Sequence, residues 1–167
     1  MAGRRRLPRR RGDAMGKILE FLTVNVATPD LEGTLAKWRK LGLVALPPAH
    51  MPQPPIEITD VTLPLGPLGA ISVIAPTGPG SAVNRFLAKR GAGAYSIAVR
   101  VDSLPEVMTE WAAAGAEWVL PEPQELPPKT PAGRYVPEKV RINWVKPSSL
   151  DGIMLEVFEF QGRVEHH

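Results

Sequence analysis

The chain contains no cysteine, which excludes disulfides, thiolate metal ligands and a cysteine nucleophile. Histidine is nearly absent as well: His166 and His167 stand at the C-terminal end, and only His50 is internal. A site built from several histidines is therefore excluded. No apolar stretch approaches the roughly 18 residues that a membrane-spanning helix requires. We therefore expect a soluble, cytoplasmic protein with no membrane partner.

The positive charge of the chain is concentrated at one end. Residues 1–14 hold six arginines and one aspartate, and without them the net charge falls from +3 to −2. A run of this kind can bind phosphate groups. The remainder is mildly acidic, so we expect no nucleic acid on the body of the domain, and we expect residues 1–15 to form a disordered, arginine-rich tail.

The remaining composition suits one folded domain. The chain has 167 residues, of which 44% are hydrophobic and 22% are charged, values that are typical of a soluble globular domain. We predict a single domain over residues 16–160, followed by a C-terminal tail over residues 161–167.

The first structural unit is a strand followed by a helix. Residues 18–26 alternate apolar positions and carry β-branched residues, which predicts a strand. Thr28 then resembles a helix N-cap, with proline at the first helical position and an acidic residue in the first turn. Apolar residues follow at helical spacing, and Gly42 ends the helix.

This unit recurs 73 residues later. Residues 94–101 predict a second strand, and Asp102 or Ser103 begins a second helix. Three residues of the first unit have counterparts at that constant offset: Leu31, Trp38 and Gly42 correspond to Leu104, Trp111 and Gly115. Each unit is followed by segments that alternate like strands: 57–63 and 69–75, then 116–120, 140–145 and 152–160. The repeat predicts an α+β fold of two βαβββ modules, at 17–76 and 92–160.

Two further segments connect these elements. Between the modules, the turn-rich residues 76–81 lead into a short helix that Ser81 begins and that ends near Gly91, so residues 77–91 form a linker helix. The second module carries an insertion at 121–139 that is too rich in proline for regular structure. Such a loop either contributes to binding or is merely tolerated at the surface, and the sequence leaves both open.

Two stretches, residues 75–119 and 144–160, resemble methylmalonyl-CoA epimerases of the vicinal-oxygen-chelate (glyoxalase/bleomycin-resistance) superfamily. Residues 21–43 are similar to the opening strand and helix of the wider superfamily. The resemblance implies that the two modules curl one mixed sheet into a cup that holds the site. It also implies a divalent metal held by four side chains, which stabilises an enolate, and a homodimer. Whether one chain or two complete the cup stays open.

The four metal positions of that family fall on Thr23, Ser72, Ser96 and Glu156 of this sequence, and the histidine paired with the third falls on Tyr95. Three hydroxyls and one carboxylate make a poor divalent site, because hydroxyls are weak ligands and imidazole is missing. We therefore predict no metal and no other cofactor. The family's proton-transferring acid has no clear counterpart, since the corresponding stretch, residues 45–57, offers only Glu57.

We expect Glu156 to be the catalytic residue. A carboxylate among hydroxyls in a half-dry cavity can act as a general base, and a buried carboxylate calls for a neighbouring cation such as Arg100 or Arg141. The predicted substrate-binding residues are Thr23, Ser72, Ser96, Tyr95, Trp144 and Arg141. Tyr95 precedes Ser96, so it faces the cup only if a bulge interrupts the strand.

Three functions remain open at this stage. The first is a metal-independent isomerase or lyase that acts on a small carbonyl compound or an acyl thioester. The second is a non-catalytic module that sequesters a small molecule, as resistance-type members of the superfamily do. The third is a degenerate half of a larger complex, with the arginine-rich tail as its docking segment.

Overall fold

The computed structural model describes residues 16–167, so the predicted arginine-rich tail lies outside the described part of the chain. The elements of the first half are β1 (Ile18–Ala27), α1 (Leu31–Arg39), β2 (Ala49–Met51), β3 (Ile58–Pro64) and β4 (Ala70–Pro76). The linker helix is α2 (Val83–Arg90). The second half contains β5 (Gly93–Val101), α3 (Leu104–Ala113), β6 (Gln124–Glu125), β7 (Tyr135–Val145), a short 3-10 helix (Pro147–Ser149) and β8 (Met154–His166).

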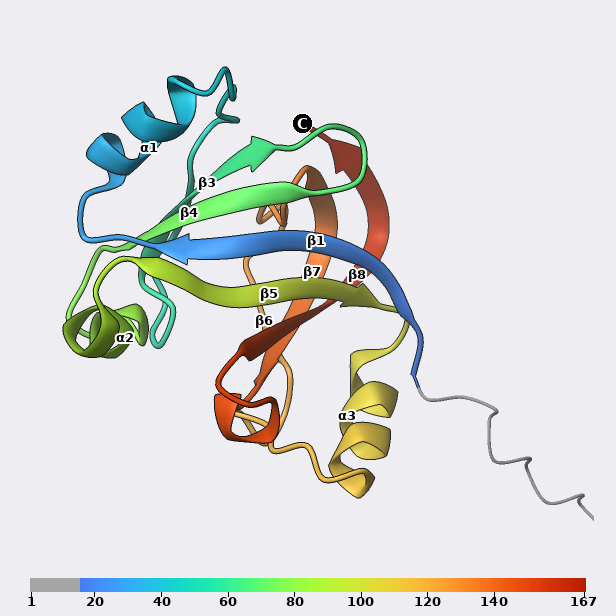
Figure 1. Cartoon of the computed structure of the whole chain (residues 1–167). Coiled ribbons are helices and arrows are strands. Elements are labelled where there is room, and N and C mark those ends of the chain that lie inside the picture. The colour runs from blue at the N-terminus through green and yellow to red at the C-terminus, as the bar shows by residue number, and fades with distance from the viewer. Residues whose placement is uncertain (1–15) are drawn as a thin grey trace, which may run out of the picture.

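The eight strands form one curled sheet in the order β2-β3-β4-β1-β5-β8-β7-β6 (Figure 1). Antiparallel pairing of β1 with β5 joins the two halves, while β1 pairs with β4 and β5 with β8 in parallel. The edges are the two short strands β2 and β6. This mixed sheet confirms the predicted α+β fold of two βαβββ modules. None of the helices within residues 16–167 is long and apolar enough to cross a membrane.

The strand register supports the internal repeat. Asn25 of β1 pairs with Ser72 of β4, and Ala98 of β5 pairs with Glu156 of β8. Since Asn25 and Ala98 are related by the 73-residue offset of the repeat, Ser72 and Glu156 occupy equivalent points in the two modules. The glycines that were predicted to end the helices also agree, because Gly42 and Gly115 have positive φ values of 84° and 100°.

Alternation along the strands separates an outer core from the interior of the cup. In β3, Val61 and Leu63 pack outward with Leu35 of α1, while Ile58 and Asp60 face inward and line a cavity. In the second half, α3 packs against the outer face of β5, β7 and β8, with Leu104 and Val107 fully buried there. The two helices thus brace the back of the sheet and leave its concave face free for a site.

The cap of α1 differs from the prediction, whereas Ser103, one of the two predicted caps, begins α3. Asp30, rather than Thr28, caps α1 and accepts a hydrogen bond from the backbone N–H of Gly33 at 3.0 Å. The hydroxyl of Thr28 instead accepts a hydrogen bond from the backbone N–H of Asp30 at 3.0 Å, so Thr28 helps to hold the capping residue in place. Ser103 caps α3 by position but makes no capping side-chain bond.

The strands of the second half also differ from the prediction. Residues 116–120 form no strand and contribute only an isolated bridge between Trp118 and Val145. The pairing of β7 with β8 instead extends from Val145 and Leu155 to Tyr135 and His166. Residues 161–166, predicted as a tail, are therefore the end of β8, because β7 begins within the proline-rich insertion and offers them a partner.

Candidate functional site

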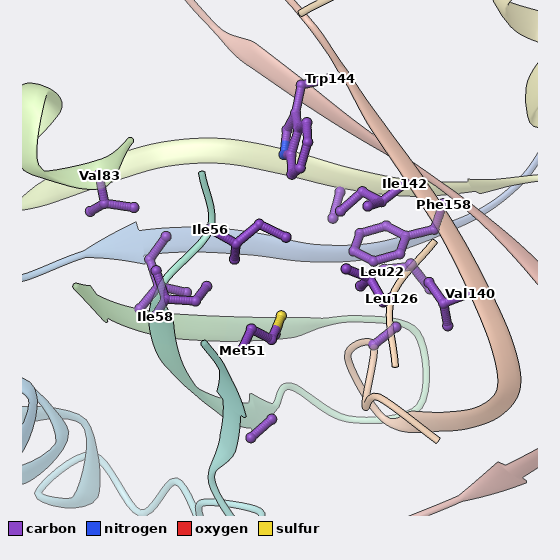
Figure 2. Close-up of a cluster of buried hydrophobic side chains, with 14 of the residues drawn as sticks. Leu22, Met51, Ile56, Ile58, Val83, Leu126, Val140, Ile142, Trp144 and Phe158 are labelled. Atoms are coloured by element: carbon purple, nitrogen blue, oxygen red, sulfur yellow. The ribbon is translucent and has the colours of Figure 1, made fainter. Parts of the chain in front are cut away.

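The concave face of the sheet encloses a cavity of about 80 Å³. Its walls come from both modules of the one chain, and most of the side chains are apolar. Figure 2 shows Met51, Ile56 and Ile58 from the first half facing Ile142, Trp144 and Phe158 from the second. Residues 131–133 also line the cavity, so the proline-rich insertion forms part of its wall.

Glu156 lies on the wall of this cavity and both of its carboxylate oxygens accept hydrogen bonds. The side-chain amide of Asn25 donates to Oε2 at 2.6 Å, and the indole N–H of Trp144 donates to Oε1 at 3.0 Å. Trp144 is the cross-strand partner of Glu156 in the β7–β8 pair, which explains its reach. These two neutral donors orient the carboxylate and satisfy it without a salt bridge.

The environment of Glu156 makes its proton hard to remove. Burial, and after it the negative charge of Asp60, raise the pKa of Glu156 from 4.5 to about 7. The hydrogen bonds from Trp144 and Asn25 oppose this rise in pKa, because they stabilise the charged form. A carboxyl with a pKa near 7 holds its proton about half of the time at neutral pH, which suits a group that both removes and returns protons.

A second carboxyl, Asp60 of β3, lines the same cavity. Burial raises the pKa of Asp60 from 3.8 to about 6, against the opposing effect of the Ser72 hydroxyl. Its Oδ1 is buried and has no hydrogen-bond partner among residues 16–167. Asp60 was not predicted as a site residue from the sequence. The available signal was an aspartate at an inward-facing position of a predicted strand whose inward neighbour, Ile58, is apolar.

Asn25 connects the predicted hydroxyls to the carboxylate. Thr23 donates a hydrogen bond to Oδ1 of Asn25 at 2.7 Å, and the amide of Asn25 donates to Ser96 at 2.8 Å as well as to Glu156. Thr23 and Asn25 line the cavity, whereas Ser96 is buried behind Asn25 and does not. Asn25 was not predicted as a site residue from the sequence, although Asn25 lies two residues from Thr23 on the same face of β1.

Tyr95 reaches the cavity through a strand irregularity. The pairing of β1 with β5 shifts between Asn25 and Val26, and this bulge turns Tyr95 toward the interior. Burial raises the pKa of Tyr95 to about 12, helped by the charge of Glu156 and opposed by that of Arg85. The Tyr95 hydroxyl therefore keeps its proton at physiological pH and can donate a hydrogen bond.

Arg141, a predicted substrate-binding residue, and Glu57, the only acid of residues 45–57, lie elsewhere. Arg141 does not line the cavity, because it faces the outer side of β7, where its guanidinium approaches Glu125 at 3.3 Å and Glu159 at 4.0 Å. Glu57 also lies off the cavity, and its carboxylate packs against the loop around Gly78 and Gly80. The structure thus brings Thr23, Ser72, Tyr95, Trp144 and Glu156 to the cavity and leaves Arg141 and Ser96 away from its surface.

The residues at the family's metal positions do not fit a divalent cation. Both carboxylate oxygens of Glu156 accept N–H groups, and the hydroxyl oxygen of Ser96 accepts the side-chain amide of Asn25. A cation would meet donor hydrogens where it needs lone pairs. Within residues 16–167 no group of three or more histidine, aspartate or glutamate side chains is arranged to hold a metal.

Comparison with known proteins identifies the family. The model of the glyoxalase/bleomycin resistance protein/dioxygenase superfamily matches residues 24–136, and the chain belongs to this superfamily. A search of the curated proteins finds no match.

Among solved structures, methylmalonyl-CoA epimerase from Mycobacterium tuberculosis is 22% identical, with a TM-score of 0.73 over 89% of this chain and 93% of that one. A hypothetical protein from Bacillus halodurans C-125 is 22% identical, with a TM-score of 0.72 over 88% and 98%. The Streptomyces coelicolor epimerase in complex with 2-nitronate-propionyl-CoA is 19% identical, with a TM-score of 0.72 over 87% and 100%. At these identities the likeness concerns the fold.

Proposed function

We propose that the cavity binds a small carbonyl compound or an acyl thioester and that Glu156 moves a proton at the carbon next to the carbonyl, without a metal. The reaction is then of the isomerase or lyase type. The observation that carries this proposal is a carboxyl whose pKa lies near 7, held by two hydrogen bonds in a mostly apolar cavity. The fold neighbours crystallised with acyl-CoA ligands support the substrate class.

Three further side chains complete the proposed chemistry. Removal of a proton next to a carbonyl places negative charge on the carbonyl oxygen, and a hydrogen-bond donor must meet that charge. The hydroxyl of Tyr95 lines the cavity and keeps its proton, so it suits this role. Asn25 and Trp144 hold Glu156 in place through its two oxygens. Removing one such oxyanion donor typically costs about 100-fold or more in rate.

The proposal is tested by hydrogen exchange. Wild-type protein is incubated in heavy water with acyl thioesters of N-acetylcysteamine, and deuterium incorporation next to the carbonyl is followed by NMR or mass spectrometry. Glu156→Gln, which keeps the shape but cannot take a proton, should abolish incorporation. The matched control is Glu122→Gln, at an exposed position outside the cavity, which should leave it unchanged. Exchange that persists in Glu156→Gln contradicts the proposed role.

A non-catalytic binding function is the second candidate. It is favoured by the satisfied state of Glu156, whose two oxygens already have hydrogen-bond partners. A binding protein would gain thermal stability from its ligand, show no exchange with any thioester, and keep its ligand affinity in Glu156→Gln. The walls of the cavity described here come from both modules of a single chain.

We also infer a cytoplasmic homodimer from the family resemblance. The start of β1 exposes Ile18, Leu19 and Phe21 by 53%, 50% and 40%, and this apolar surface supports association of two copies. Light scattering coupled to size exclusion gives the mass directly. A monomer at micromolar concentration would contradict the inference.

A further inference from the structure

The charges inside the cavity all have one sign. The titratable side chains that line it are Asp60 from β3, Tyr95 from β5 and Glu156 from β8, and the lining residues of β1, β4 and β7 are neutral. No lysine, arginine or histidine is among the lining residues described for this cavity. The positive charge of Arg85 of α2 acts on Tyr95.

The two carboxyls come from opposite modules and influence each other across the cavity. The charge of Asp60 raises the pKa of Glu156, so a ligand placed between them lies near both groups. Oδ1 of Asp60 is buried with no hydrogen-bond partner among residues 16–167, and the Ser72 hydroxyl offsets only part of the cost of ionising Asp60, so a negative charge on Asp60 acts electrostatically on a ligand in the cavity. Neutral donors satisfy Glu156, and the lining residues described for the cavity offer no positive charge to a third carboxylate.

We propose that Asp60 is a specificity residue, which together with Glu156 restricts the cavity to acyl groups without a free carboxylate and rejects acyl groups that carry one. This inference rests on the proposed acyl-binding function and names its substrate class. Like charges about 4 Å apart at an effective dielectric constant of about 20 weaken binding by roughly a thousandfold. A carboxylate ligand would have to bind together with protons that neutralise the cavity.

Proton uptake sets the expected size of the penalty. The pKa of Glu156 is about 7 and that of Asp60 is about 6. At pH 8, a ligand that binds only when Glu156 is protonated loses roughly tenfold in affinity, and a ligand that requires protonated Asp60 loses roughly a hundredfold. The penalty for a carboxylate ligand at pH 8 therefore lies between about 10-fold and about 1,000-fold. At pH 5.5 both groups are largely protonated, and the penalty should nearly vanish.

A matched pair of probes tests this. The 2-methylacetoacetyl and methylmalonyl thioesters of N-acetylcysteamine differ by an acetyl group in place of a carboxylate of similar size. Their affinities are measured by isothermal titration calorimetry at pH 8 and pH 5.5, in two buffers of different ionisation enthalpy so that proton uptake is counted. The neutral probe should bind at least tenfold more tightly at pH 8. The carboxylate probe should gain affinity at pH 5.5 and bind with proton uptake at pH 8.

Asp60→Asn should reduce the preference at pH 8 by about tenfold or more, while Asp151→Asn, at an exposed position away from the cavity, should leave it intact. The pH dependence of probe binding is measured on the wild type, so this part of the test does not depend on whether Asp60→Asn folds. Equal affinities for the two probes at pH 8, or tighter binding of the carboxylate, would overturn the proposal. A preserved preference without any hydrogen exchange would contradict the catalytic role of Glu156 but support this inference.

Discussion

Replacing Asp60 by asparagine should stabilise the protein at alkaline pH. Asp60 is buried beside a second carboxyl and its Oδ1 has no hydrogen-bond partner among the described residues, so its ionisation in the folded state is unfavourable. Asparagine has nearly the same shape and carries no charge. The substitution therefore removes an electrostatic cost, and the amide oxygen of asparagine can still accept from the Ser72 hydroxyl, which opposes the rise in the pKa of Asp60.

The magnitude follows from the pKa of Asp60, which rises from 3.8 to about 6 on folding. A carboxyl with a raised folded-state pKa stabilises the fold fully below its unfolded pKa and loses that contribution as the pH rises through its folded pKa. The loss between about pH 4 and pH 6 corresponds to about 3 kcal/mol. For Glu156, raised from 4.5 to about 7, the same loss extends to about pH 7.

Urea unfolding at pH 4, 6 and 8 measures this effect. Asp60→Asn and the wild type should be equally stable near pH 4, and the variant should be more stable by about 1 to 3 kcal/mol at pH 8. Asp151→Asn, at an exposed site, is the control and should follow the wild type at every pH. A variant whose stability falls with pH as steeply as that of the wild type would refute the electrostatic argument.

Three further substitutions probe other parts of the structure. Trp144→Phe removes the indole donor to Glu156, so the pKa of that carboxyl should rise above 7, as an NMR titration would record; an unchanged value would show that the bond contributes nothing. Leu63→Ala, in the core beneath α1, should cost about 2 to 5 kcal/mol in urea unfolding. Glu159→Gln weakens the acceptor for the backbone N–H of Leu104 at the start of α3 and should lower the free energy of unfolding by about 1 kcal/mol. At low pH, where Glu159 of the wild type is protonated, the variant and the wild type should be equally stable.

The fold was predictable because its signals are local. Strand alternation, helical spacing and the terminating glycines Gly42 and Gly115 can each be recognised from a few consecutive residues. Because of the 73-residue repeat, each of these signals occurs twice in the sequence. The strand β2 was missed because its three residues lie in a proline-rich stretch and owe their form to pairing with β3. The length of β8 was missed for the same reason, since β7 supplies its partner.

The candidate site was only partly predictable. Glu156 could be placed because residues 144–160 resemble the last hairpin of the family, which ends in a metal-binding glutamate. Asn25 and Asp60 could not, since their importance depends on which strands become neighbours and on how the sheet curls. The amide of Asn25 meets Glu156 from a strand 131 positions away in sequence, and no periodicity encodes that distance. Arg141 was predicted to face the cup but lies on the opposite face of β7, because the residues next to it in the sequence do not indicate which face of that strand points inward.

The short edge strands bear on how the protein behaves at high concentration. An open sheet offers unpaired backbone groups at both ends, and other chains can add to them as extra strands. Here those ends are β2, with three residues, and β6, with two, so neither presents a long template. Beyond β6, the backbone N–H groups of Leu126 and Lys129 donate to carbonyls of β7 and occupy part of its outer edge. We expect the folded chain to resist edge-to-edge aggregation even when it is crowded.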